Sequence, residues 1–162
     1  MRRCTMSEKI LIPLDGSTLG EAALRYVEER VSKLATGKKT EVVLLQVITS
    51  LTHTIAAGES AVEIPYTESE LEQTKKMTMD YLDEAGEGLK SRGAVVKCIA
   101  AFGTSSANEI IKAEEEVGAD MVAMSTHGRH GFSRWAFGSV TDKVLRGGKV
   151  PVLMVRMPKK AE

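Results

Sequence analysis

The sequence predicts an α/β protein with one doubly wound, Rossmann-like sheet of five parallel strands in the order 3-2-1-4-5, and helices on both faces. Three observations support this prediction. Apolar runs alternate with helical patterns along the whole chain of 162 residues. The second of these runs is apolar on both faces, which is typical of parallel strands covered by helices. No repeat, low-complexity tract or shift in composition divides the chain, so we expect a single domain over residues 1–162.

The first strand and helix are predicted close to the start of the chain. Residues 10–14 form an apolar run, and the turn sequence Asp15-Gly16-Ser17 ends it. Thr18 and Glu21 have the spacing of a capping box, in which each side chain bonds the other residue's backbone N–H. The apolar residues that follow recur at helical spacing, which predicts a helix that ends at Gly37.

The middle of the chain is predicted to hold a second strand and a long helix. Residues 41–49 are apolar on both faces, and residues 67–91 carry an apolar stripe at helical spacing. The sequence does not define where that helix ends, because its last turns contain Gly86 and Gly88 and glycine weakens helices. Residues 50–65 show no clear period, and we expect them to form a mobile loop.

The remaining elements repeat the same alternation. Ser106 and Glu109 have capping-box spacing before a third apolar helix, and Gly138-Ser139 opens a fourth over residues 139–146. Strands are predicted at residues 94–101, 120–124 and 150–156.

The strand order predicts where a ligand binds. In open parallel sheets, ligands bind beyond the carboxyl ends of the strands where the winding direction reverses. For the order 3-2-1-4-5 this place lies between strands one and four. Asp15 and the loop that follows Met124 both fall there.

The loop from Ser125 to Gly138 has the composition of a phosphate site. Glycine allows the backbone to come close to an anion, and a helix start offers free N–H groups and the positive end of a dipole. The alternative is that the glycines only let the loop turn. Asp15 likewise has two interpretations: a ligand for ribose, adenine or Mg²⁺, or a cap for its own turn.

Charge and composition exclude several classes of function. The 22 basic and 22 acidic side chains cancel, so no global field attracts nucleic acid or an anionic membrane. No apolar run reaches the ~18–20 residues of a membrane span, and residues 1–7 lack the apolar stretch of a signal peptide and are expected to be frayed. Two cysteines make no disulfide framework. We expect a cytoplasmic protein that binds neither nucleic acid nor membrane.

These residues resemble the universal stress protein family, in its ATP-binding branch. That family carries Gly-x-x-Gly, nine residues and then Gly-Ser/Thr after its fourth strand. Here the second glycine matches Gly128, the nine residues are 129–137, and Gly138-Ser139 followed by Val140 closes the motif. Pro13-Leu14-Asp15 is similar to the end of the family's first strand.

The resemblance implies a site for ATP, with ADP or AMP as further ligands and Mg²⁺ held beside Asp15. In the family a valine of the second strand, here Val47, holds adenine through its backbone. The residues implied as nucleotide contacts are Pro13, Leu14, Asp15, Val47, Met124, Ser125, Thr126, His127, Gly128, Arg129, Gly138, Ser139 and Val140.

One position departs from the motif. Ser125 stands where the family has its first glycine. If this position needs positive φ or bare backbone against a phosphate, the added Cβ weakens binding. If it has ordinary strand geometry, the hydroxyl supplies a contact instead.

The resemblance also implies a homodimer, formed through the apolar last strand, Val150–Arg156, whose edge ends the sheet. We expect an ATP-dependent regulatory protein that acts on a protein partner which the sequence does not identify. Two other functions stay open. One is a slow ATPase or phosphotransferase that uses His127, Ser139 or a metal at Asp15, and the other is a dimeric scaffold without nucleotide.

Overall fold

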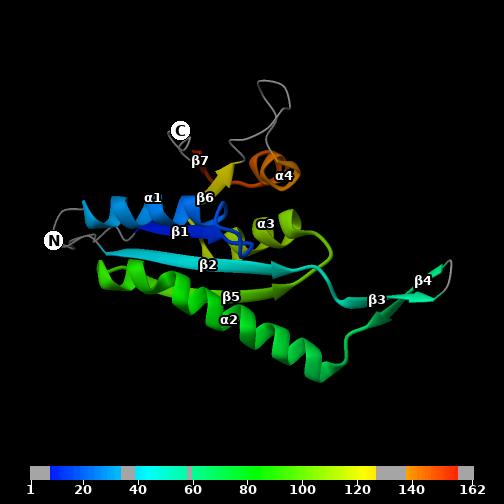
Figure 1. Cartoon of the computed structure of the whole chain (residues 1–162). Helices are drawn as coiled ribbons and strands as arrows, with labels where there is room; N and C mark the ends of the chain where they lie inside the picture. Colours follow the sequence, from blue (N-terminus) through cyan, green and yellow to red (C-terminus); the bar gives the residue numbers. More distant parts are fainter. Residues whose placement is uncertain (1–7, 34–38, 58–59, 127–137, 157–162) are drawn as a thin grey trace, which may run out of the picture.

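A five-stranded parallel sheet forms the centre of the molecule (Figure 1). The computed structural model describes residues 8–33, 39–57, 60–126 and 138–156, so residues 1–7 lie outside it. The sheet has the order β5-β2-β1-β6-β7, which confirms the predicted order 3-2-1-4-5. Its strands are β1 Glu8–Pro13, β2 Thr40–Ile48, β5 Val95–Phe102, β6 Met121–Thr126 and β7 Val152–Arg156.

Helices cover both faces of this sheet, as predicted (Figure 1). The helices α1, Glu21–Ser32, and α2, Glu68–Ser91, pack on one face. On the other face lie α3, Ser106–Val117, and α4, Ser139–Gly147. In the part of the chain that the structure describes, no helix combines the length and apolar character needed to cross a membrane.

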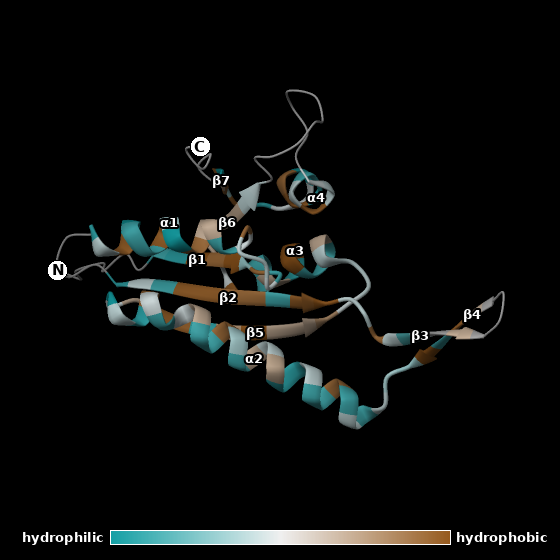
Figure 2. Cartoon of the chain, in the orientation of Figure 1, coloured by the Kyte–Doolittle hydropathy of each residue, from teal (hydrophilic) through white to brown (hydrophobic). Residues whose placement is uncertain are grey.

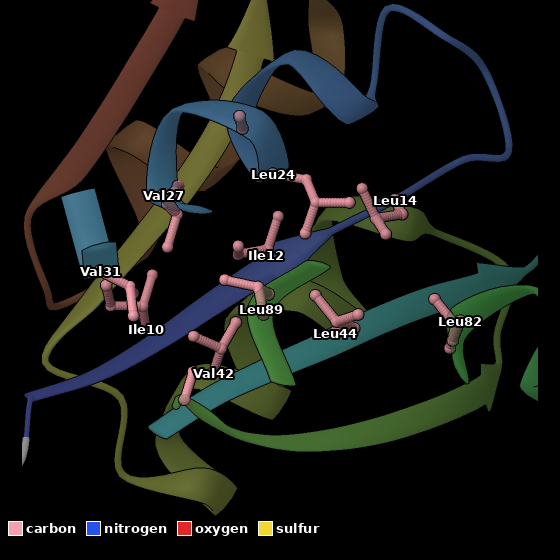
Figure 3. Close-up of a cluster of buried hydrophobic side chains, with 13 residues drawn as sticks. Ile10, Ile12, Leu14, Leu24, Val27, Val31, Val42, Leu44, Leu82 and Leu89 are labelled. Atoms are coloured by element: carbon pink, nitrogen blue, oxygen red, sulfur yellow. The ribbon is translucent and has the colours of Figure 1, made fainter. Parts of the chain in front are cut away.

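The two central strands, β1 and β2, send apolar side chains to both faces. Ile10 and Ile12 point toward α1 and α2, and Leu11 between them joins the cluster under α3 and α4. All three are fully buried. Figure 3 shows the first cluster, and Figure 2 shows the apolar centre of the sheet with hydrophilic residues on the outer helix surfaces. Burial on both sides explains why these runs do not alternate.

The prediction of an irregular segment over residues 50–65 was wrong. These residues form an antiparallel hairpin of β3, Thr52–Ala57, and β4, Ser60–Pro65. The hairpin projects from the sheet beyond the end of β2 (Figure 1). His53 Nε2 lies 2.8 Å from Glu70 Oε1, so one side-chain contact ties the hairpin to the first turn of α2.

Two of the predicted helix caps were also wrong. The capping box of Thr18 and Glu21 does not form, because α1 begins at Glu21 with Gly20 as its N-cap and no side-chain cap of its own. The cap of α3 is Ser105, one residue before the predicted Ser106, and its hydroxyl lies 3.5 Å from the backbone nitrogen of Asn108.

The long helix α2 has the capping box that the sequence pattern placed elsewhere. The Thr67 hydroxyl accepts from the backbone N–H of Glu70, and the Glu70 carboxylate accepts from that of Thr67. Bonds from the Thr67 backbone and hydroxyl, followed by one from His53, lower the pKa of Glu70 to about 2. Gly86 does not interrupt the helix. A Cβ there would lie 3.0 Å from Val96 Cγ1, so the glycine lets α2 approach the sheet closely.

Candidate functional site

A cleft of about 260 Å³ opens at the carboxyl ends of β1 and β6, where the winding direction of the sheet reverses. It extends over the end of β2 toward the first turns of α3 and α4. Nine predicted site residues line it: Pro13, Leu14, Asp15, Val47, Met124, Ser125, Gly138, Ser139 and Val140. Two segments more than a hundred residues apart therefore meet as expected from the strand order.

One of the predicted residues that the structure describes does not line this cleft. Thr126 is buried at the end of β6, where it pairs with Arg156 of β7. His127, Gly128 and Arg129 lie outside the described residues.

The cleft also has lining residues that sequence patterns did not single out. They are Gly20, Leu45, Ser106, Ile110 and Thr141. Leu45 lies on the predicted second strand two residues before Val47, so the period of a strand could have identified it. Ser106 and Ile110 come from α3, and only the packing of that helix on the sheet brings them to the cleft. Leu45, Val47 and Ile110 make one wall apolar.

The turn after β1 presents Asp15 to the cleft. Leu14 donates its N–H to the Leu45 carbonyl oxygen at 2.8 Å, so the end of the first strand stays fixed to the second. Asp15 Oδ1 then accepts from the Ser17 backbone N–H at 2.9 Å and from the Ser17 hydroxyl at 2.6 Å. Gly16 supplies the left-handed turn, with φ of 79°. Asp15 thus caps its own turn through one oxygen and also lines the cleft, so the two interpretations of this residue are compatible.

The first backbone N–H groups of α1 are hydrogen-bonded to other groups of the protein. The backbone N–H of Ala23 donates to Ser125 Oγ at 2.9 Å, across from β6. The two preceding N–H groups donate to the carbonyl oxygens of Ser17 and Leu19, at 3.2 and 3.1 Å. All three orphan donors of the first turn are therefore satisfied, and this helix start has none left for an anion.

The start of α4 differs from that of α1. Gly138 is its N-cap, without a side-chain cap, and the first intrahelical bond runs from the N–H of Asp142 to the Gly138 carbonyl oxygen at 2.9 Å. Within the described parts of the chain, the N–H groups of Ser139, Val140 and Thr141 have no hydrogen-bond acceptor. These three residues line the cleft. The positive end of the helix dipole, together with a helix start that has no side-chain cap, gives this wall affinity for an anion.

Ser125 is a regular residue of β6, paired with Val155 of β7. Its position therefore does not require the left-handed conformation that would favour glycine. The hydroxyl accepts from the Ala23 N–H and donates to the Gly20 carbonyl oxygen at 2.8 Å. The strand geometry at this position is therefore ordinary, and the contacts of the hydroxyl are with protein groups at the start of α1.

Two carboxylates, those of Asp15 and Glu21, act on the hydroxyl of Tyr81. Tyr81 of α2 donates its hydroxyl to Glu21 Oε1 at 3.3 Å. Burial, followed by the charge of Glu21 and that of Asp15, raises the pKa of Tyr81 to about 12. No group of three or more potential metal ligands occurs among the described residues. Among the described residues that line the cleft, Asp15 is the one carboxylate.

The fold and this cleft define a doubly wound α/β protein with a cleft at the switch point of its sheet. The sequence model of the Universal stress protein family matches residues 6–156. The universal stress protein MJ0577 of Methanocaldococcus jannaschii is 32% identical over an alignment 164 residues long. The alignment covers 93% of this chain and 96% of that protein. The chain belongs to the universal stress protein family.

Solved structures agree with this assignment. A structure of MJ0577 has a TM-score of 0.68 and 28% identity, and the match covers 96% of this chain and 99% of that one. A universal stress protein from Archaeoglobus fulgidus in complex with dAMP has a TM-score of 0.58 and 15% identity, over 93% of this chain and 98% of that one. A universal stress protein in complex with cAMP has a TM-score of 0.58 and 19% identity, over 94% and 98%.

Proposed function

We propose that this protein binds ATP in the cleft and works as a nucleotide-dependent regulatory switch in a stress response. The observation that carries the proposal is the pairing of an apolar chamber with the uncapped start of α4 in one cleft. A purine base needs an apolar wall, and a phosphate chain needs free N–H donors. The complexes of two family members with cAMP and dAMP support an adenine nucleotide as the ligand.

Each part of the ligand has a proposed contact. The base lies against Leu45, Val47 and Ile110, and the ribose hydroxyls donate to Asp15. The phosphates bind the N–H groups of Ser139 and Val140. ADP and AMP fit the same base and ribose positions with fewer phosphate contacts.

Mg²⁺ fits this arrangement as a companion of the phosphates. Mg²⁺ is commonly held by one or two carboxylates together with water and substrate phosphates, and Asp15 supplies one carboxylate at the cleft. The ion would neutralise phosphate charge close to Asp15 and Glu21.

Replacing Asp15 with alanine tests the proposal. We expect wild-type protein, denatured directly after purification, to release an adenine nucleotide, and calorimetric titration of nucleotide-free protein to show ATP binding. Asp15→Ala should weaken ATP binding about tenfold, which corresponds to one lost charge-assisted hydrogen bond. Asp83→Ala is the matched control, because this carboxylate is exposed on α2.

Two results would contradict the proposal. If the protein releases no nucleotide and ATP gives no calorimetric signal, ATP binding is excluded, and the function as a dimeric scaffold without nucleotide remains. Equal ATP affinity in wild type and Asp15→Ala would remove Asp15 from the site. Phosphate release above that of a buffer blank would show that the switch also hydrolyses ATP, and Asp15→Ala would then report whether the metal position serves that reaction.

We further propose a cytoplasmic homodimer that engages a protein partner in one nucleotide state. β7 ends the described sheet, so its outer edge offers unpaired backbone groups to a second copy. Light scattering on the eluted protein should give twice the chain mass of 17.6 kDa. A mass of one chain at all concentrations would contradict this pairing.

A further inference from the structure

A single chain of hydrogen bonds links β6 to the carboxylate of Asp15. The Ser125 hydroxyl donates to the Gly20 carbonyl oxygen at 2.8 Å, and the Gly20 N–H donates to Ser17 Oγ at 3.0 Å. The Ser17 hydroxyl in turn donates to Asp15 Oδ1 at 2.6 Å. Four residues thus connect β6 to the turn after β1, and three of them, Ser125, Gly20 and Asp15, line the cleft.

The directions of these bonds are mutually consistent. The Ser125 hydroxyl accepts from the Ala23 N–H and donates to Gly20, and the Ser17 hydroxyl accepts from Gly20 and donates to Asp15. Each hydroxyl therefore uses its proton in one bond and a lone pair in another. The two bonds at each hydroxyl polarise one another, and the covalent backbone of Gly20 joins the two pairs.

The Asp15 carboxylate occupies the space that a side chain at Gly20 would need. A Cβ at Gly20 would lie 2.5 Å from Asp15 Oδ1 and 3.4 Å from its carboxyl carbon. The backbone of Gly20 is thus in direct contact with the carboxylate. Because α1 has no side-chain cap of its own, Ser125 is also the group that caps its third helical N–H.

From this chain we infer that Ser125 is a positioning residue, which sets the Asp15 carboxylate for the nucleotide. The inference rests on the proposed function and deepens it, because Ser125 acts through Gly20 and Ser17 and its hydroxyl is already used by protein groups. The inference predicts an effect opposite to the one that the glycine of the family motif would suggest. Placing the family's glycine at position 125 weakens the site.

The test compares Ser125→Ala and Ser125→Gly with wild type by calorimetric ATP titration, at a temperature where all variants are folded. Both variants should bind ATP about tenfold more weakly, which is the order of one structured hydrogen bond. In an Asp15→Asn background the same two substitutions should change the affinity by less than about twofold, because coupled residues are not additive. Thr67→Ala is the control, since it removes the cap of α2 and should lower the unfolding midpoint without changing ATP affinity.

A readout without nucleotide separates this inference from the proposed function. In ligand-free protein, Ser125→Ala should shift the NMR amide signals of Ala23, Gly20 and also Ser17, whose N–H donates to Asp15. A merely local role at the helix start would leave the Ser17 signal in place.

Three outcomes would overturn the inference: ATP affinity in Ser125→Gly equal to or above that of wild type, an equal loss in the Asp15→Asn background, or an unchanged Ser17 signal. Failure of wild-type protein to bind ATP would instead overturn the proposed function, and the Ser17 signal would still decide whether the chain acts on Asp15.

Discussion

Gly20→Val should lower ATP affinity about 100-fold, or ~2.8 kcal/mol, with little change in stability. The new Cβ would lie 2.5 Å from Asp15 Oδ1, so the carboxylate must leave its place beside Ser17. The branched side chain would also occupy part of the cleft, which Gly20 lines. The backbone of Gly20 has right-handed helical geometry, with φ of −55°, so the substitution adds no strain of its own. Calorimetric titration with ATP measures the loss.

Gly88→Val is the matched control for this substitution. Gly88 lies in α2, and a Cβ there would meet the carboxylate of Glu28 in the same way. The site is a separate cleft between α1 and α2, away from β6 and α4. We expect Gly88→Val to keep wild-type ATP affinity. Equal losses in both variants would mean that the effect of Gly20→Val comes from general distortion.

Leu89→Ala should have the largest effect on stability, a loss of about 2–5 kcal/mol of unfolding free energy. Leu89 of α2 is fully buried, and it belongs with Ile10, Val31 and Val42 to the core cluster shown in Figure 3. Removing its branched end leaves a cavity in a region made of two helices and two central strands, which cannot close without moving the sheet. Equilibrium unfolding in urea measures the change.

Met77→Ala is the control on the same helix, because Met77 is 65% exposed. Its effect should stay within about 0.5 kcal/mol. Leu89→Ala should also keep wild-type ATP affinity in conditions where it is folded, since the cluster lies away from the cleft. A loss below that of Met77→Ala would contradict the packing of the last turns of α2 on the sheet.

The fold was predictable from sequence because its signals are local and repeated. The two-faced apolar runs of β1 and β2 fix a covered parallel sheet, and alternation with helices fixes its topology. The hairpin of β3 and β4 was not recognised, although Val62 and Ile64 alternate with polar neighbours as strand residues do. The alanines at the facing ends of the two strands, with Gly58 between them in the sequence, hid this period, and both apolar side chains are about half exposed.

The candidate site was predictable where a sequence motif meets the end of a strand, as at Asp15, or the start of a helix, as at Gly138. The site was not predictable where it depends on contacts between residues that are far apart in the sequence. The pattern at Thr18 indicated a local cap for α1, whereas the structure supplies the cap from Ser125 of β6. Ser106 enters the cleft only because α3 packs against β2. No local pattern contains such contacts.

The central position of β1 has a consequence for the order in which the molecule is completed during synthesis. β1 leaves the ribosome first, and its pairing with β2, as in Ile12 with Leu44, can follow early. Its other edge pairs with β6 only after Met121 has been made. Until then the half-built sheet carries an open edge, which is a template for wrong pairing between chains. The cleft spans the same junction, so it exists only once the last third of the chain has joined the first.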